Sequence, residues 1–123
     1  MTIEKILAKV DELKPNQYSD NIKIGWISEL EGKIYKEMVL THEHEEEDIT
    51  FSGYTENDMG RELIAEDPYC NVYEDYLYAK IDFMNGETDR YTNSMIMFNA
   101  DMRAFQNWYN RTHMPLSTPL KLF

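Results

Sequence analysis

The segment from Asp67 to His113 constrains the fold of this chain more than any other part of it. It is rich in aromatic and methionine side chains on both sides of one turn signal, Asn85-Gly86. Asn and Gly tolerate the left-handed backbone conformation that ends a helix, and a short connection places two helices antiparallel. The sequence therefore predicts a helical hairpin. Its apolar side chains exceed what one small domain buries, which indicates contacts with other copies of the chain.

The second helix of this hairpin has the clearest pattern. Its apolar residues recur at alternating spacings of four and three, which places them on one face: Tyr91, Met95, Phe98, Met102, Phe105 and Tyr109. We predict that this face forms the packed core of the hairpin. The flanking Met97 and Trp108 are predicted to form a second stripe that faces a partner. The two predictions are compatible.

The first helix of the hairpin is predicted to begin at Asp67 as the N-cap, with Pro68 at the first helical position, where a missing N–H costs nothing. Apolar residues surround most of its circumference, so we expect it to have neighbours on more than one side. A narrow polar arc remains, which is predicted to face solvent: Asn71, Glu74, Asp75 and Asp82.

Two further helices are predicted in the N-terminal half. Thr2 or its neighbour is predicted to cap a short amphipathic helix over roughly residues 3–13. This helix ends at Lys14-Pro15, because a residue before proline disfavours helix. Ser19 caps a longer helix whose apolar positions recur as far as Met38. The other side of this helix is predicted to be charged: Glu29, Glu31, Lys33, Lys36 and Glu37.

Gly25 and Gly32 lie seven residues apart inside this longer helix. Each costs up to ~1 kcal/mol of helix propensity relative to alanine. Either another helix or a partner approaches closely at the two glycines, or the cost is simply tolerated. Both interpretations remain open at the level of sequence.

Helical periodicity disappears between residues 42 and 66, and after His113 two prolines exclude helix. The predicted fold is therefore all-α. It is a four-helix bundle-like domain over residues 1–113, with a long acidic loop between the second and third helices, followed by an extended C-terminal tail over residues 114–123. The loop contains an acidic run: Glu43, Glu45, Glu46, Glu47 and Asp48.

The charge of the chain excludes several classes of function. At 123 residues it is expected to form one domain, and its net charge is −11. Binding to duplex DNA or to an anionic membrane requires an excess of lysine and arginine, which this chain lacks.

A single cysteine, Cys70, cannot form an internal disulfide and is predicted to be a small buried hydrophobe. The chain shows no membrane span and no signal peptide, so we expect a soluble cytoplasmic protein.

Residues that bind metals or catalyse reactions are sparse. His42 and His44 flank Glu43, which supplies enough ligand types for a divalent metal, but a glutamate-rich loop offers no rigid support for one. We predict a solvated loop and no metal site. The sequence contains no phosphate-binding glycine loop, nucleophile elbow, cysteine pair or HExxH motif. We therefore predict no catalytic residues, no cofactor and no enzyme activity.

The chain resembles the small all-helical head-tail connector proteins of tailed phages and prophages of Gram-positive bacteria. The resemblance covers nearly the whole chain and is one of packing and turns. The segments that carry it are residues 6–19, the run from Trp26 to Glu37, the run from Tyr76 to Asp82 with Asn85-Gly86-Glu87, Tyr91-Thr92-Asn93-Ser94, Phe98-Asn99-Ala100, and the run from Tyr109 to Pro115.

This resemblance implies a structural role in head completion. Such adaptors form a helical ring, commonly of twelve subunits, under the portal protein. The ring extends the DNA channel and docks the stopper or the tail, and DNA passes through it without specific binding. The expected location is the virion neck, and the host cytoplasm during assembly. A channel lined by carboxylates repels phosphate and keeps the duplex moving, which agrees with the net charge of −11.

The residue patterns and the resemblance together assign roles to particular residues. The interface between subunits is predicted at Met97, Trp108, Gly25 and Gly32. The acidic run departs from the usual pattern of these adaptors, and its residues either line the channel or face outward. The tail is predicted to dock on the portal through four apolar residues: Leu116, Leu120, Leu122 and Phe123.

Two other functions were weighed against this one. An acidic helical protein of this size is also compatible with an inhibitor that mimics DNA and acts by protein–protein binding. Such a mimic needs carboxylates in two rows at phosphate-like spacing, whereas here the acids cluster in one loop. A metal-dependent enzyme built on His42 and His44 is the weaker alternative.

The tail hypothesis predicts the effect of a truncation. Deleting the residues after Met114 should leave the helical content and the melting temperature nearly unchanged while abolishing binding to the portal. The prolines in the tail favour an extended backbone that loses less entropy on docking. Circular dichroism and co-purification with the portal measure the two effects. Full-strength portal binding by the truncated chain, or its unfolding, would contradict the hypothesis.

Overall fold

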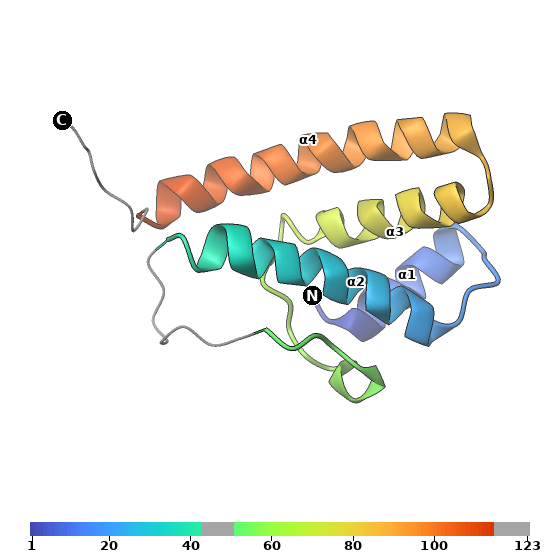
Figure 1. The fold of residues 1–123 in the computed structure, drawn as a ribbon, viewed down its shortest axis with the longest axis horizontal. Coiled ribbons are helices and arrows are strands. Elements are labelled where there is room, and N and C mark those ends of the chain that lie inside the picture. Colours follow the sequence, from blue (N-terminus) through green and yellow to red (C-terminus); the bar gives the residue numbers. More distant parts are fainter. Residues whose placement is uncertain (43–50, 115–123) are drawn as a thin grey trace.

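Four α-helices make up most of the chain in a computed structural model that describes residues 1–42 and 51–114 (Figure 1). A π-helical turn, η1, continues α2, and a 3₁₀ turn, η2, lies between α2 and α3. The described residues contain no strand, which confirms the all-α prediction for them. The elements are α1 (Ile3–Leu13), α2 (Asp20–Ile34), η1 (Tyr35–Val39), η2 (Glu56–Asp58), α3 (Asn71–Met84) and α4 (Thr88–Thr112).

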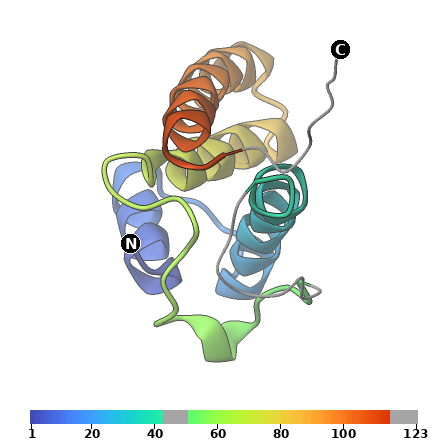
Figure 2. The ribbon, with the colours of Figure 1, turned by 90° about the vertical axis from the view of Figure 1, so that its left-hand side faces the viewer.

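The central element is α3, which contacts each of the other three α-helices. Figure 2 shows α4 lying over α3, with α1 and α2 on the opposite side. The prediction that α3 has neighbours on more than one side is confirmed. The core is formed by apolar residues of α1, α2 and α3 together with the end of α4, and it includes Ile6, Ile27, Tyr73, Leu77 and Phe105.

The predicted starts of the two N-terminal helices are correct. The side chain of Thr2 caps α1 by accepting a hydrogen bond from the backbone N–H of Lys5 (3.4 Å). The hydroxyl of Ser19 caps α2 by accepting from the N–H of Ile22 (3.3 Å). Each cap satisfies a backbone donor that has no partner within its helix.

The hairpin boundaries differ in part from the prediction. Helix α3 begins at Asn71 and not at Pro68, because a turn closed by the hydrogen bond from Tyr69 N to Glu66 O (2.7 Å) precedes it. The carboxylate of Asp67 accepts a hydrogen bond from Cys70 Sγ (2.8 Å) instead of capping the helix. At the other end of α3 only Gly86 is left-handed, with φ +73°, whereas Asn85 keeps helical dihedrals.

The polar arc of α3 is not the solvent face that the sequence predicted. Glu74 is 5% exposed and Asp82 is 1% exposed, because α1 covers both residues with lysines. Lys9 Nζ lies 3.0 Å from Glu74 Oε1, and Lys14 Nζ lies 2.6 Å from Asp82 Oδ1. The hydroxyl of Ser94 on α4 donates to Asp82 Oδ2 (2.8 Å). Pairing of this kind lets a carboxylate be buried next to an apolar core.

A third carboxylate, predicted to lie on a charged helix face, is also buried. Glu31 is fully covered, and its two oxygens accept three hydrogen bonds. The hydroxyl of Tyr73 donates to Oε1 (2.5 Å), and the hydroxyl of Tyr54 and the N–H of Ile64 each donate to Oε2 (2.9 Å). Removal from water raises the pKa of the Glu31 carboxyl, and the three donors oppose that rise. One side chain thus joins α2, α3 and the segment between them.

This arrangement predicts that Glu31→Ala destabilises the protein by about 3–5 kcal/mol, because several buried donors lose their acceptor at once. Urea unfolding followed by circular dichroism measures the change. Glu29→Ala on the same helix is the matched control, since the Glu29 side chain is 45% exposed and its loss should cost ~1 kcal/mol or less. Equal effects of the two substitutions would contradict a structural role for Glu31.

Candidate docking groove

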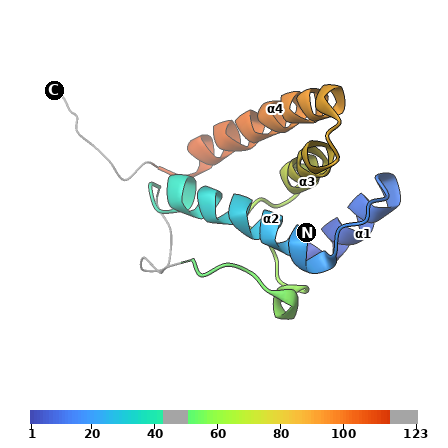
Figure 3. The same ribbon diagram turned by 45° about the vertical axis from the view of Figure 1, so that its right-hand side comes forward.

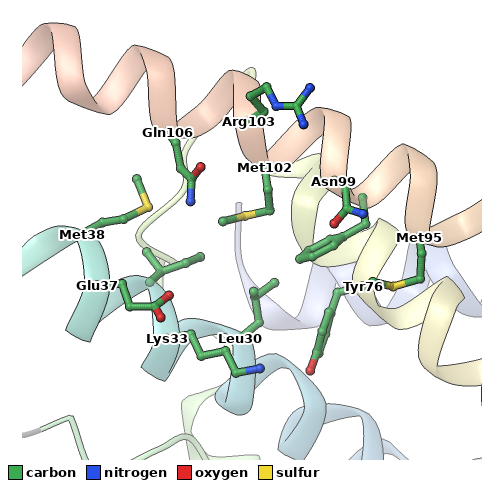
Figure 4. A pocket seen from close by; sticks show the side chains of 12 residues that line it. Leu30, Lys33, Glu37, Met38, Tyr76, Met95, Asn99, Met102, Arg103 and Gln106 are labelled. Carbon is green, nitrogen blue, oxygen red and sulfur yellow. The ribbon is translucent and has the colours of Figure 1, made fainter.

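A groove runs between α2 and α4, with α3 forming its floor (Figure 4). Its volume is about 440 Å³. Its lining combines apolar and polar side chains, and three methionines belong to it, Met38, Met95 and Met102. The other lining residues are Leu30, Lys33, Ile34, Glu37, Tyr76, Phe98, Asn99, Arg103 and Gln106. We call this feature the α2–α4 groove.

The groove exists because α4 is only partly packed against its neighbours. Phe105 is fully buried and Tyr109 is 6% exposed, so the predicted core face holds for the C-terminal half of α4. The rest of the same face, Tyr91, Met95, Phe98 and Met102, is only half-buried. Figure 3 shows that α2 and α4 are close at one end and diverge toward the other. The predicted apolar face of α4 therefore belongs to the core in its C-terminal half and lines the groove in the rest.

His42 links η1, which continues α2, to α4. Its Nδ1 lies 2.7 Å from the backbone oxygen of Met38, and its Nε2 lies 2.7 Å from Asn110 Oδ1 on α4. The ring also meets Tyr109 edge-on, with centroids 5.1 Å apart. Both ring nitrogens are thus engaged within the protein. His44 lies outside the described residues, and within those residues no three His, Cys, Asp or Glu side chains gather to hold a metal ion.

Tyr76 stands in the middle of the floor. Its hydroxyl donates to Glu29 Oε1 on α2 (2.8 Å), and its ring lies 5.3 Å from that of Phe98 on α4. Beyond Tyr76 the groove continues into a second hollow of about 290 Å³, which shares Lys33, Tyr76 and Met95 with the first and extends to Phe83. The continuous apolar floor therefore follows α4 for most of its length.

The lips of the groove differ in charge from the rest of the molecule. Lys33 on α2 and Arg103 on α4 are the cations of the first hollow, and Glu37 is its one carboxylate. The charge of Lys33 also acts on Glu29 of the same helix. In the second hollow Glu29 and Lys80 pair with each other, Nζ to Oε1 3.5 Å. Two cations and one carboxylate leave the lips net positive in a chain of net charge −11. An apolar, methionine-rich floor with polar lips suits an amphipathic protein segment.

The four residues predicted to form an interface do not line the groove. Met97 is 57% exposed on α4. Trp108 packs within its own domain, with its ring 5.2 Å from that of Tyr69. A Cβ added to Gly25 would meet nothing within 4 Å, and one added to Gly32 would lie 3.5 Å from the ring of Phe51. The structure therefore gives Gly32 an intramolecular neighbour and leaves Gly25 open.

The remaining predicted site residues lie outside the described part of the chain. They are the tail residues Leu116, Leu120, Leu122 and Phe123, and the acidic run Glu43, Glu45, Glu46, Glu47 and Asp48. The sequence analysis missed the groove itself. Met95 and Met102 on the predicted apolar face of α4 could have indicated a binding surface, because methionine is common at adaptable binding surfaces.

Comparison of the chain with protein-family models, curated proteins and solved structures gives no match. Within residues 1–42 and 51–114, no helix is long and apolar enough to cross a membrane. The geometry of the α2–α4 groove and the resemblance of the sequence are therefore the two sources for a functional proposal.

A pair of carboxyl groups lies where α3 meets α4 beside the groove. Asp75 Oδ2 is buried without a hydrogen-bond partner among the described residues. Burial first, and then the neighbouring Asp101 of α4, raise the pKa of Asp75 to about 8. Asn71 Nδ2 on α3 donates a hydrogen bond to Asp101 Oδ2 on α4 (3.0 Å). The contact between the two helices is thus strongest when Asp75 holds its proton.

A pKa raised from 3.8 to about 8 means that the native state binds this proton more tightly than the unfolded state. The stabilisation is complete below pH ~4 and is lost as the pH rises through ~8. Asp75→Asn should therefore stabilise the protein by about 1–2 kcal/mol at pH 8–9, with the gain shrinking toward pH 4. Urea unfolding across this pH range measures it. Asp89→Asn, at an exposed position of α4, should change nothing, and a parallel response of both variants would contradict the assignment.

Proposed function

We propose that this protein is a structural adaptor that works by docking to further copies of itself and to neighbouring protein rings. The α2–α4 groove is the observation that carries this proposal. It is an apolar surface of helical length, bordered by Met95 and Met102, that the protein's own described residues do not fill. Grooves of this kind bind amphipathic segments of partner proteins.

Apolar side chains exposed outside the groove also support the proposal. Burial of apolar surface contributes roughly 25 cal/mol per Å² to association. The side chains in question are Leu13, Ile22, Met84, Ile96 and Met97, each 46–63% exposed.

The resemblance of the sequence to phage head-tail connectors suggests where in the virion the adaptor is located. In this proposal the protein forms a ring beneath a portal protein in the virion neck, and the resemblance implies twelve subunits. It extends the DNA channel and receives the stopper or tail-completion protein. The net charge of −11 suits a channel through which DNA passes without binding. The role requires no catalytic residue and no cofactor.

The alternative of an acidic DNA mimic has less support. A mimic must display its carboxylates in rows on the surface, whereas several carboxylates of this chain serve its own fold. Glu31, Glu74 and Asp82 are buried and accept hydrogen bonds or ion pairs from within the protein. Their charges are therefore not available to imitate phosphates.

The proposed function predicts that the concentrated protein forms closed rings, alone or when mixed with its portal. Negative-stain electron microscopy and sedimentation velocity detect such rings directly. A concentration of about 1 mM exceeds the dissociation constant of a weak specific interface. A protein that stays monomeric at this concentration and forms no ring with the portal would contradict the proposal.

A further inference from the structure

The chain leaves α4 beside the α2–α4 groove. His113 follows Tyr109 by one helical turn, and the two rings stack with centroids 3.9 Å apart and an angle of 4° between their planes. Tyr109 also contacts His42, whose Nδ1 lies 2.7 Å from the backbone oxygen of Met38, a lining residue of the groove. Figure 1 shows the C-terminal ends of α2 and α4 at the same end of the molecule. Residues 115–123 therefore follow α4 at one end of the groove.

The length of the chain after α4 matches the length of the groove. Met95 lines both hollows and precedes His113 by roughly five turns of helix, or about 27 Å at a rise of ~1.5 Å per residue. Residues 114–123 contain two prolines that exclude helix, and an extended chain of that length spans roughly 33 Å. A segment that folds back at His113 can therefore reach along the whole first hollow of its own chain.

The composition of this segment suits the lining of the groove. The segment has one charged side chain, Lys121, and four large apolar ones, Leu116, Leu120, Leu122 and Phe123. The charges of the two hollows nearly balance, and they are Lys33, Lys80 and Arg103 against Glu29 and Glu37. A nearly balanced set of charges neither attracts nor excludes a segment strongly. Burial of apolar side chains against the three methionines therefore decides which occupant is favoured.

The polar lining residues favour an extended occupant over a helical one. Asn99 and Gln106 place their side-chain amides in the groove beside Met102 (Figure 4). An amide side chain both donates and accepts hydrogen bonds. An extended backbone exposes N–H and C=O groups that need such partners, whereas a helix satisfies these groups internally. The groove thus offers polar partners that a proline-containing segment requires.

These observations identify an occupant for the groove. We propose that residues 115–123 dock in the α2–α4 groove of their own chain and cover the surface that binds other copies. The covering role rests on the proposed function, self-assembly, whereas the docking itself does not. Because the segment is tethered to α4, it competes with a second copy at an effective concentration on the order of millimolar.

Docking of the tail in its own groove couples two contacts of the adaptor. Residues 115–123 are also the segment predicted to dock on the portal, and one segment cannot occupy both places at once. Binding of the tail by the portal then uncovers the groove, and by linkage an uncovered groove favours binding of the tail to the portal. Free copies thus stay apart, and assembly begins where a portal is present.

The docking is tested on the full chain by NMR of methionine methyl groups. The tail variant combines Leu120→Asn with Leu122→Asn, which removes apolar side chains and leaves the net charge unchanged. The methyl signals of Met95 and Met102 should shift in this variant, because both residues line the groove. The signal of Met97 should stay in place, since Met97 lies on α4 outside the groove.

Two controls accompany this measurement. Ser117→Asn combined with Thr118→Asn changes the same tail without removing a large apolar side chain, and it should leave all the methionine signals in place. The spectra are recorded on dilute protein and at a tenfold higher concentration. Docking within one chain predicts the same shifts at both concentrations. Circular dichroism verifies that each variant is folded.

Sedimentation velocity tests the covering role. The tail variant should self-associate about tenfold more strongly than the wild type, because its groove is open to other copies. Adding Met95→Gln to the tail variant should remove this gain, whereas adding Met97→Gln should not. Arg103→Glu, at an exposed position on the lip, is a second groove variant that alters no buried side chain.

The other outcomes overturn the inference or the function. Unchanged signals of Met95 and Met102 in the tail variant exclude docking of the tail, and the adaptor function stands. Shifts that appear only at the higher concentration assign the groove to the tail of a neighbouring copy. Equal association of the wild type and the tail variant excludes the covering role. A failure of every protein to associate, with the portal or without it, overturns the adaptor function and the covering role together, while the methyl signals still report on docking.

Discussion

The buried carboxylate of Glu31 is the interaction on which the rest of this fold depends. It accepts hydrogen bonds from Tyr73 on α3, from Tyr54 and from the backbone of Ile64. These donors lie 23, 33 and 42 residues after Glu31 in the sequence. A buried carboxylate is tolerated only when its lone pairs are satisfied. The segment between α2 and α3 is thereby held against both helices. With that connection fixed, α3 can occupy the centre of the molecule.

The central position of α3 has a cost that α1 offsets. A helix enclosed by three others buries its polar residues as well as its apolar ones, and here Glu74 and Asp82 receive lysines from α1. The helix α4 receives no comparable lysine contact from α1. It is held by Phe105 and Tyr109 at one end, by Ser94 near the other, and by the carboxyl pair of Asp75 and Asp101 between them. Incomplete packing of α4 is what leaves the groove open.

Local signals in the sequence predicted the local features of this structure well. The caps at Thr2 and Ser19, the left-handed Gly86 and the apolar face of α4 all follow from preferences of a few neighbouring residues. The errors concern partners that are distant in sequence. Helical periodicity places Glu31 and Glu74 on polar faces, but it carries no information about the tyrosines and lysines that reach them from other elements. The groove was missed for the same reason, since the distance between α2 and α4 is set by α3 and by His42.

His42 joins α2 and α4 at one end of the groove only, and the two helices separate from there (Figure 3). α3 lies between the two diverging helices and packs against both of them. A segment bound in the groove would therefore touch α2, α3 and α4 at once.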